Sequence, residues 1–402
     1  MNQKHLSRRI NSLSESATLA MTRKSRELKE AGKDVINLSI GEPDFNTPQC
    51  IKEAAIDAIN NNITHYPPVS GYKELKKAIT EKFKNENKLN YATDQVVVSN
   101  GAKQSIANTI LCLVDPGDEV LIPEPYWVSY PEMAKLAEGV PVFIPSSIEN
   151  DFKVKPEDVK KKITGRSKVF LFSSPCNPSG TIYSRDELRA IAEVLAEKED
   201  LYVISDEIYE QINFVGNHES IAQFDFIKDR VITVNGVSKG FAMTGWRIGY
   251  IGAPTHIARA SNTLQGQYTS GPSSISQMAA LKALQTGPYA LAEIQEMKVA
   301  FQERRDLVIE HLKRIPGIKT NIPGGAFYIF PDVSYYYGKS QGNTTINNGM
   351  DLCLYLLDTV QVALVPGSAF GTPDHIRISY ATSTESLNRA FERIAGALDR
   401  LK

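Results

Sequence analysis

A lysine and an arginine stand eight residues apart in a stretch of small and apolar residues, "NGVSKGFAMTGWRIGY". Lys239 lies among glycine, valine, serine and alanine, and Arg247 follows it. Most lysines are simply solvated at the surface, which is the ordinary interpretation of Lys239 taken alone. A lysine without a nearby carboxylate can also act as an amine that condenses with a carbonyl group. The residues that accompany Lys239 decide between the two.

Polar side chains follow five apolar, strand-like runs, at the point where each run ends. Ligands of open parallel sheets bind outside the carboxyl ends of the strands, so these residues are candidates for one crevice. They are a helix start at Gly101, Ala102 and Lys103, an aromatic at Trp127, an amide at Asn177, an acid and a phenol at Asp206 and Tyr209, and the amine and guanidinium of Lys239 and Arg247.

Together these residue types suit pyridoxal 5'-phosphate. A phosphate would bind at the helix start and to Arg247, and Trp127 would stack on the ring. An acid would keep a ring nitrogen protonated, while a phenol and an amide would hydrogen-bond a ring oxygen. The lysine would form a Schiff base with the cofactor, so its small neighbours indicate a cofactor rather than a carboxylate as its partner.

Each of these residues also has an ordinary explanation when it is considered alone. "SNGA" can be a tight turn and cap, "NPSG" is a common turn sequence, and Trp127 can belong to the core. The acidic "YVISDE" resembles the end of a strand in a nucleotide hydrolase. The chain has no Gly-x-x-x-x-Gly-Lys-Ser/Thr loop, however, and no G-x-G-x-x-G follows an early strand. A nucleotide site is therefore the weaker interpretation.

The elements that would position these side chains alternate between strand-like and helical patterns from about residue 50 to 290. "DQVVVSNGA", "DEVLIPEP" and "SKVFLFSSPCNPSG" each lead into a helical pattern. This alternation predicts an α/β fold, with a mostly parallel sheet flanked by helices. Ser184 and Glu187 form the capping-box pattern at the start of one of the helices.

The pattern changes after about residue 290. "EIQEMKVAFQERRDLVIEHLKRI" predicts a long amphipathic helix, and a helix near 350–359, strand-like runs and a last helix follow it. This mixture is typical of an α+β domain. The polar stretch "GKSQGNTTINNG" predicts a surface loop. We therefore predict a large cofactor-binding domain over 49–295, and a smaller α+β domain formed by 1–48 and 296–402.

The composition is that of an ordinary globular protein, with 402 residues, 42% hydrophobic and 23% charged, and a net charge of -1. A net charge close to zero does not indicate binding to nucleic acid or to an anionic membrane, both of which favour strongly basic proteins. No run approaches the roughly 20 apolar residues of a membrane span. The four cysteines and six histidines are scattered, so we expect no disulfide and no metal site. A cytoplasmic location is the expectation.

Six motifs resemble those of the class I aminotransferases of fold type I. In chain order they are "NLSIGEPDF", "PEPYWVSYPEM", "NPSG", "VISDEIYE", "SKGFAMTGWRIGY" and "RISYAT". The chain is most similar to the bacterial aspartate aminotransferase group, which includes bifunctional aspartate/prephenate enzymes. The resemblance runs from about Leu6 to the end of the chain. The lysine-to-arginine segment and "SDEIYE" are very specific when they occur together in this order.

The resemblance implies the same roles for the residues named above and adds three further residues. Arg377, in "HIRISYA", matches the arginine that binds the substrate α-carboxylate. Tyr66, in "THYPPVSGY", matches a tyrosine that reaches the phosphate of the neighbouring subunit. Gly41 matches the glycine of a mobile N-terminal segment over the substrate, which Trp127 and Asn177 also contact. The family fold implies a homodimer with both sites at the interface.

Three positions depart from the family pattern. Ser179 stands in "NPSG" where threonine is usual, and both residues carry a hydroxyl. Gly236 stands three residues before the lysine, where some aminotransferases have a phosphate-binding serine. The residues near Ser14 differ from those of the prephenate-using bacterial members, where a basic residue is common. This last departure weakens the prephenate assignment.

The resemblance implies an aspartate transaminase with ping-pong kinetics, which converts L-aspartate and 2-oxoglutarate into oxaloacetate and L-glutamate. Lys239 would be the base at the substrate Cα, and Arg377 would orient the bond to be cleaved. A prephenate or aromatic aminotransferase is the nearest alternative, followed by a pyridoxal-phosphate lyase. A regulatory protein on this fold would lack the lysine or carry a DNA-binding segment, and the chain shows neither feature. The residue that binds a distal carboxylate is not identified.

Overall fold

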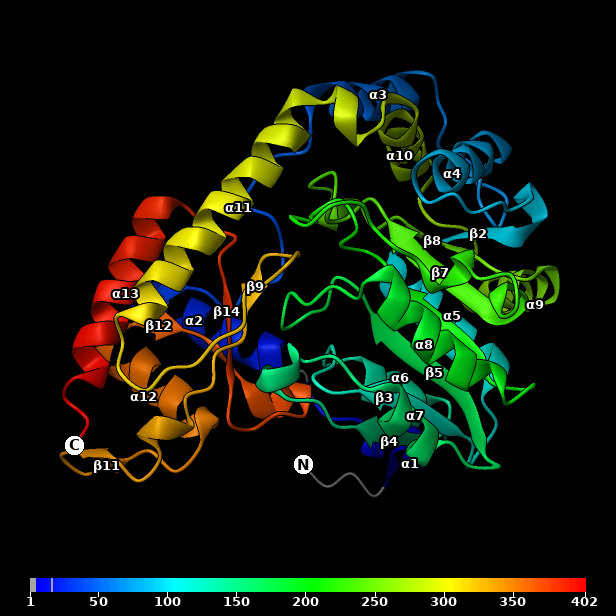
Figure 1. Cartoon of the computed structure of the whole chain (residues 1–402). Coiled ribbons are helices and arrows are strands. Elements are labelled where there is room, and N and C mark those ends of the chain that lie inside the picture. The colour runs from blue at the N-terminus through cyan, green and yellow to red at the C-terminus, as the bar shows by residue number, and fades with distance from the viewer. Residues whose placement is uncertain (1–4, 16) are drawn as a thin grey trace.

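A seven-stranded sheet forms the centre of the larger part of the molecule. The computed structural model describes residues 5–15 and 17–402, and Figure 1 shows this sheet among helices on the right of the view. The strand order is β2-β8-β7-β6-β5-β3-β4. The strands are β2 (Val96–Ser99), β3 (Glu119–Pro123), β4 (Val140–Ile144), β5 (Ser167–Ser173), β6 (Tyr202–Asp206), β7 (Val231–Gly236) and β8 (Gly249–Gly252).

The sheet is parallel except at β8, which is antiparallel to both β2 and β7. The predicted mostly parallel sheet is therefore confirmed. The sequence patterns missed β4 and β8. β4 lies at the sheet edge and begins with the exposed Val140, and β8 begins and ends with glycine. Neither looks like the buried apolar runs of the other strands.

Helices cover both faces of the sheet. Successive residues of a strand point to opposite faces, so a strand that is apolar throughout places apolar side chains on both. Val97 and Ile204 pack in one cluster with α5, α6 and α9, whereas Val96 and Val203 belong to the cluster that includes α4, α8 and α10. The helices of this part are α3 (Gln49–Asn60), α4 (Lys73–Glu86), α5 (Ala102–Leu113), α6 (Tyr130–Leu136), α7 (Pro156–Lys162), α8 (Arg185–Ala196), α9 (Thr255–Tyr268) and α10 (Ser274–Thr286).

The start of α8 matches the sequence prediction. The Oγ of Ser184 accepts a hydrogen bond from the N–H of Glu187 at 3.3 Å, and the Glu187 carboxylate accepts one from the N–H of Ser184 at 2.7 Å. The capping box is therefore confirmed. It fixes the point at which the loop after β5 ends and the helix begins.

The remaining elements gather mainly on the left of Figure 1, and the long helix α11 runs diagonally toward them from α3 and α10. They include a parallel pair, β1-β12, and an antiparallel sheet, β13-β14-β9. These elements are α1 (Arg8–Asn11), α2 (Ala17–Glu30), β1 (Ile36–Asn37), α11 (Ala292–Lys313), β9 (Tyr328–Ile329), β10 (Ser340–Gln341), β11 (Thr344–Thr345), α12 (Gly349–Val360), β12 (Val362–Ala363), β13 (Val365–Pro366), β14 (Ile376–Ser379) and α13 (Thr384–Leu398).

The long helix after residue 290 and the helix near 350–359 are confirmed as α11 and α12. The loop prediction for "GKSQGNTTINNG" is wrong in part. The segment lies at the surface, but β10 and β11 pair as an antiparallel hairpin around Gly342, whose φ is 58°. Strands of two residues are too short to leave a periodic pattern in the sequence.

The division into domains at 48/49 and 295/296 stays a prediction. α11 begins at Ala292 and continues across the second boundary without a break. The short helix α1 packs on α6, and Arg9 lies 3.5 Å from Glu138. The N-terminal segment therefore contacts both groups of elements.

Two expectations from composition concern membranes and cysteines. Within residues 5–15 and 17–402, no helix is both long and apolar enough to cross a membrane. The four cysteines are free thiols.

Candidate active site

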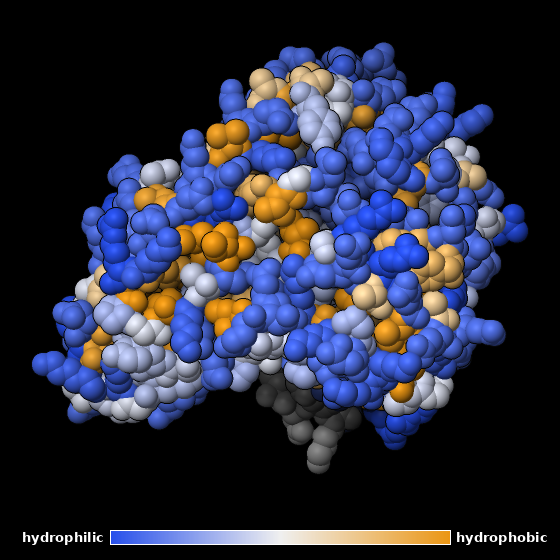
Figure 2. Space-filling view, viewed as in Figure 1, coloured by the Kyte–Doolittle hydropathy of each residue, from blue (hydrophilic) through white to orange (hydrophobic). Residues whose placement is uncertain are grey.

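The carboxyl ends of the six strands that run in one direction lie at one edge of the central sheet, and the antiparallel β8 begins at that edge. Arg247, which precedes β8, therefore lies beside residues that follow the parallel strands. Figure 2 shows apolar side chains gathered in the middle of the viewed face, between the two groups of elements. A cavity of about 280 Å³ has walls from both groups. The predicted site residues among its walls are Gly41, Ala102, Lys103, Trp127, Asn177, Asp206, Tyr209, Lys239, Arg247 and Arg377.

Lys239 follows β7 and has no acid as its partner. Its Nζ donates to the carbonyl oxygen of Gly41 at 2.5 Å, and within the described residues it forms no ion pair. Burial lowers the pKa of Lys239 to about 8; Glu42 opposes this effect, and Arg377 and Arg247 add to it. The amine is therefore far easier to deprotonate than an ordinary lysine.

Asp206 ends β6 and is only 4% exposed. Its Oδ2 accepts a hydrogen bond from the Tyr130 hydroxyl at 2.7 Å, and its Oδ1 accepts one from the N–H of Ile208 at 3.3 Å. Burial raises the pKa of Asp206 to about 6, although both hydrogen bonds oppose this effect. The carboxylate is mostly ionised at neutral pH and can pair with a protonated nitrogen.

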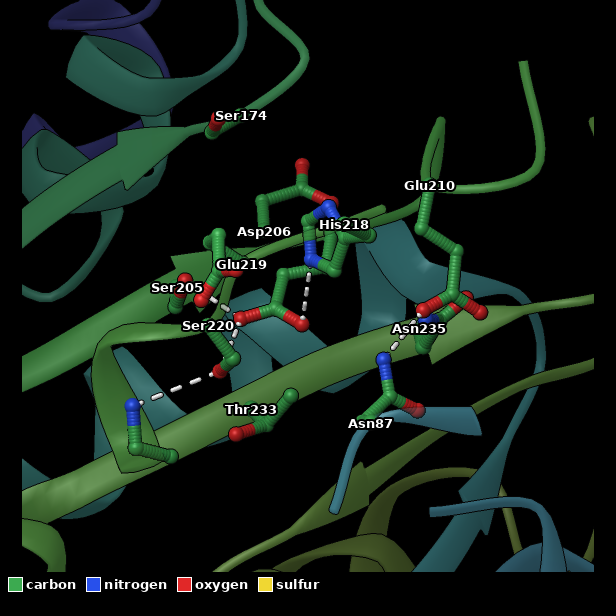
Figure 3. A network of polar contacts seen from close by, with 12 residues as sticks. Asn87, Ser174, Ser205, Asp206, Glu210, His218, Glu219, Ser220, Thr233 and Asn235 are labelled. Atoms are coloured by element: carbon green, nitrogen blue, oxygen red, sulfur yellow. Dashed lines mark hydrogen bonds and ion pairs between the residues drawn. The ribbon is translucent and has the colours of Figure 1, made fainter. Parts of the chain in front are cut away.

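A buried polar network begins at the next residue, Glu207. The Glu207 carboxylate accepts hydrogen bonds from the hydroxyls of Ser205 at 2.9 Å and Ser220 at 2.6 Å, and it lies 2.9 Å from His218 Nε2. Figure 3 shows Ser205, His218 and Ser220 close together. Burial would lower the pKa of His218, but Glu207 outweighs it and the pKa is raised. The pair is therefore ionic over a wider pH range than an isolated histidine would allow.

Glu210 extends this network. It pairs with the buried Lys82 ammonium and accepts a hydrogen bond from Asn87 at 2.7 Å. Within the described residues, Glu207, Glu210 and His218 lie close enough together to hold a metal ion. The two carboxylates already have partners in Lys82, Asn87, His218 and the serine hydroxyls, whereas His218 Nδ1 has no hydrogen-bond partner within the described residues. The expectation that the chain has no metal site stays a prediction.

Tyr209, Asn177 and Arg377 belong to one connected cluster. The hydroxyls of Tyr209 and Tyr328 lie 2.9 Å apart, so one donates to the other. Arg377 donates from Nη1 to Asn177 Oδ1 at 3.0 Å, and its guanidinium lies 4.5 Å from the centre of the Tyr328 ring. Residues distant in the sequence therefore hold each other in place at one wall of the cavity.

Arg377 is a buried cation that has no counterion among residues 5–15 and 17–402. It is 1% exposed, and its Nη2 donates to the carbonyl oxygen of Ser39 at 2.7 Å. Its Nε has no hydrogen-bond partner, and within the described residues no carboxylate pairs with the guanidinium. Burial lowers the pKa of Arg377. Because a buried charge is costly unless it is paired, this position favours an anionic ligand.

The start of α5 forms an anion site together with Arg247. Gly101, with a φ of 85°, is the N-cap residue of the helix. As a glycine it has no side chain that could accept a hydrogen bond from the first N–H groups. Arg247 donates to the carbonyl oxygens of Thr244 at 2.9 Å and Asn100 at 3.3 Å, which holds its guanidinium beside the helix start. A Cβ at Gly101 would collide with that guanidinium. Free N–H groups and a nearby guanidinium are the groups that bind phosphate.

The side chain of Lys103 also reaches the cavity, whereas the sequence suggested a role only for its backbone. Its Nζ lies 4.9 Å from the centre of the Trp127 ring. Burial lowers the pKa of Lys103, and Arg247 lowers it further. Within the described residues Lys103 forms no ion pair, so it is a further cation that a ligand can neutralise.

Two predicted residues are not among the cavity walls. Tyr66 is 98% exposed in the single chain, so its predicted contact with a neighbouring subunit stays a prediction. Gly101 contributes through the helix start described above. Gly41 does line the cavity, and a Cβ there would lie 3.0 Å from the Tyr328 hydroxyl.

Sequence reasoning missed several residues of the cavity wall. Ser173 and Ser238 stand at or just beyond strand ends, so the rule that found Asp206 could have found them. Thr18 and Tyr328 come from distant segments and carry no such signal. The missed residues are Thr18, Val128, Ser129, Tyr130, Ser173, Ile208, Ser238, Thr244 and Tyr328.

Comparison with known proteins identifies the family. The family model described as aminotransferase class I and II matches residues 33–394. The chain belongs to this family. This aminotransferase is 51% identical to the bifunctional aspartate aminotransferase and glutamate/aspartate-prephenate aminotransferase of Petunia hybrida, over 99% of this chain and 83% of that protein. It is 45% identical to the aspartate aminotransferase of Geobacillus stearothermophilus, over 97% of this chain and 98% of that protein.

Solved structures agree with this assignment. The crystal structure of the aspartate aminotransferase from Rhizobium meliloti matches this aminotransferase with a TM-score of 0.95 and 44% identity, over 98% of this chain and 99% of that chain. The aminotransferase from Thermus thermophilus, solved with maleate, matches with a TM-score of 0.92 and 40% identity, over 98% of this chain and 99% of that chain.

The aminotransferase is a transaminase that depends on pyridoxal 5'-phosphate. The residues present fit this cofactor. The uncapped start of α5 and Arg247 suit its phosphate, Asp206 suits a protonated ring nitrogen, and Lys239 offers an amine without a competing acid. The unpartnered Nε of Arg377 suits the carboxylate of an amino-acid or oxo-acid substrate.

Proposed function

We propose that this aminotransferase moves the amino group of L-aspartate to 2-oxoglutarate by a ping-pong mechanism, giving oxaloacetate and L-glutamate. The main support is one cavity that holds a free amine at Lys239, a buried acid at Asp206 and an unpaired buried guanidinium at Arg377. The names of relatives support aspartate as the donor, because those from Pinus pinaster and Geobacillus stearothermophilus are aspartate aminotransferases.

The cofactor would be held through its phosphate, ring and ring oxygen. When bound, it supplies an aldehyde that amines can capture and a cationic ring that withdraws electrons from the substrate Cα. Asp206, ionised at neutral pH, would keep the ring nitrogen protonated. The other binding groups would be the N–H groups at Gly101, Ala102 and Lys103 and the Arg247 guanidinium for the phosphate, Trp127 for the ring face, and Tyr209 and Asn177 for the ring oxygen.

The substrate would be oriented by Arg377, with Gly41, Trp127 and Asn177 beside it. A guanidinium binds a carboxylate through two parallel hydrogen bonds, which fixes the direction of the Cα–H bond. Lys239, whose pKa is about 8, is roughly one-tenth neutral at pH 7, far more than an ordinary lysine. The neutral amine can remove the substrate Cα proton as a general base and then return it to a carbon atom of the cofactor.

Preference for a dicarboxylic substrate would rest on Lys103. Aspartate and 2-oxoglutarate carry a second carboxylate, and a buried carboxylate needs a cation or several donors. Lys239, Arg247 and Arg377 already have proposed roles. Lys103 is then the remaining lysine or arginine among the described residues of the cavity wall. An aromatic donor has no second carboxylate and would leave Lys103 unpaired.

Transamination of prephenate is a second candidate function. Prephenate also carries two carboxylates, so Lys103 would suit it, and the relative from Petunia hybrida is named for both activities. We rank it second because the residues near Ser14 differ from those of prephenate-using members, where a basic residue is common. Comparing turnover of prephenate and oxaloacetate with the same donor distinguishes the two functions.

We propose that the functional unit is a homodimer with both sites at the interface. The exposed Tyr66 supports this proposal, since a phenol 98% exposed in one chain is free to reach a phosphate bound by another. Within each chain we propose a large domain over 49–295 and a smaller one from 1–48 and 296–402. Small-angle scattering with and without substrate would show whether the two domains move relative to each other.

We also propose a cytoplasmic location. Four free cysteines are usual in a reducing compartment and unusual in an oxidising one. Cell fractionation with an antibody against the protein would test this location.

An absorbance spectrum tests the proposed reaction. The protein is loaded with pyridoxal 5'-phosphate, and the spectrum is followed after L-aspartate and then after 2-oxoglutarate. The visible cofactor band should fade with the first addition and return with the second. A K239A variant should show neither change nor turnover. If the band does not change with aspartate but fades with aromatic amino acids, the donor is an aromatic amino acid and not aspartate. A protein that binds no cofactor would contradict the proposal.

A further inference from the structure

The hydroxyl of Tyr130 is buried and donates to the carboxylate of Asp206. The two oxygen atoms lie 2.7 Å apart, and Tyr130 is 1% exposed. Within the described residues, the other hydrogen bond to this carboxylate comes from the N–H of Ile208 at 3.3 Å. Both bonds have the same charged acceptor, and the bond from Tyr130 is the shorter of the two, which makes it the stronger.

A tight turn fixes Tyr130 in this position. Its N–H donates to the carbonyl oxygen of Trp127 at 2.9 Å, and the two rings meet edge to face with their centres 5.5 Å apart. Tyr130 is also the first residue of α6, and it packs in the buried cluster that contains Val97 and Ile204. The hydroxyl therefore has little freedom to leave Asp206. One turn of the chain supplies both the aromatic wall of the cavity and the donor to its acid.

The charges around Asp206 oppose one another. Burial raises the pKa of Asp206, and Glu207 raises it further. The hydrogen bonds from Tyr130 and Ile208 and the charge of Lys239 act in the opposite direction. Burial already outweighs these three groups, because the pKa of Asp206 is raised, and loss of the Tyr130 hydroxyl would raise it further.

Tyr130 itself stays protonated. Burial raises its pKa well above 10, and the negative charge of Asp206 raises it further. The thiol of Cys176, whose own pKa is raised by burial, also raises the pKa of this hydroxyl. Tyr130 is therefore a permanent hydrogen-bond donor over the working pH range and not a proton-transfer group.

We propose that Tyr130 is a positioning residue that keeps Asp206 ionised and directed into the cavity. Its hydrogen bond favours the charged form of the carboxylate, and its fixed ring limits the directions that the carboxylate can take. An ionised Asp206 in turn favours a protonated ring nitrogen on the cofactor. This inference rests on the role of Asp206 proposed above.

The apoprotein tests the first step, independently of catalysis. The carboxyl carbon of Asp206 is followed by ¹³C NMR against pH in aspartate-labelled protein and is assigned with D206N. In Y130F its titration midpoint should rise by about one to two pH units, the equivalent of losing a hydrogen bond to a charged group. In the matched control Y91F, which loses a hydroxyl that lies 2.9 Å from Thr233 Oγ1, the midpoint should not move. An unchanged midpoint in a folded Y130F protein would overturn the proposal.

The loaded protein separates this inference from the proposed role of Asp206. The ¹⁵N chemical shift of ring-labelled pyridoxal 5'-phosphate reports the proton on its ring nitrogen. Y130F should shift this signal toward the unprotonated ring, and Y91F should not. If the midpoint of Asp206 moves but the ring nitrogen does not, Tyr130 still controls Asp206 and the proposed role of Asp206 fails. If neither moves, Tyr130 has no such role and that of Asp206 is unaffected.

Discussion

Two charged residues of this site, Lys239 and Arg377, have no ion-pair partner within the described residues. Lys239 donates to a backbone carbonyl, and Arg377 donates to an amide oxygen and a backbone carbonyl. Buried ions are normally paired, so each of these residues costs folding free energy that a ligand can recover. The sequence could indicate this arrangement because it placed no acid next to Lys239.

The lowered pKa of Lys239 predicts how the stability of the apoprotein changes with pH. Between about pH 8 and 10.5 the unfolded chain keeps a proton on Lys239 that the folded chain has lost. The free energy of unfolding should therefore rise with pH across this window. The same gain should be missing from K239M. Urea unfolding of both apoproteins at several pH values measures it, and parallel curves for the two proteins would contradict the shift.

Lys103 predicts the substrate preference. In K103M the KM for L-aspartate and for 2-oxoglutarate should rise by roughly tenfold or more, since a charge-assisted hydrogen bond is worth about 1.5–3 kcal/mol. The KM for an aromatic donor should change little. The exposed Lys160, whose ion pair with Glu197 lies at the surface, gives the control K160M. Equal losses for both classes of donor would exclude Lys103 as the distal contact.

At the level of elements, the direction of the strands builds the site. Six strands of one direction place their carboxyl ends at one edge, and the antiparallel β8 brings its amino end there, so Arg247 joins the residues of the other strands. A Cβ at Gly249 would collide with the backbone of Ala102, so β8 can approach α5 only with glycine at this position. The glycines that hid β8 from sequence patterns thus serve the phosphate end of the site.

The capping box of α8 predicts a local stability effect. S184A removes the hydrogen bond to the N–H of Glu187 and should lower the free energy of unfolding by about 1 kcal/mol. S184T keeps a hydroxyl and should retain most of it. Chemical unfolding of the loaded protein gives the comparison, together with the KM for aspartate, which should stay constant. A variant S184A as stable as the wild type would show that solvent replaces the cap without cost.

At the level of the whole molecule, the predicted homodimer can be tested by mixing subunits. Y66A should weaken binding of the cofactor, and K239A should abolish turnover. If Tyr66 serves the neighbouring site, a mixed dimer combines the Lys239 of one chain with the Tyr66 of the other in one complete site. Mixing should therefore restore tight cofactor binding and turnover at half of the sites. No recovery in a verified mixed dimer would place Tyr66 outside the neighbour's site.

The fold was predictable wherever elements were long and buried on a clear pattern. The alternating strands and helices, α11 and the start of α8 all followed from local periodicity and capping residues. The edge strand β4, the glycine-bounded β8 and the two-residue strands β10 and β11 were not predictable. Such elements form because a neighbouring strand offers hydrogen bonds, and no short stretch of sequence contains that information.

The sequence by itself determined which chemical groups the site contains and that strand ends would bring Asp206, Asn177, Trp127 and Lys239 together. Strand order and direction follow general rules, so residue types at strand ends are enough for this step. Only the tertiary structure decided that Tyr130 bonds Asp206, that Tyr328 lies under Arg377 and that the Lys103 side chain enters the cavity. These contacts depend on packing between residues far apart in the chain, which local patterns do not encode.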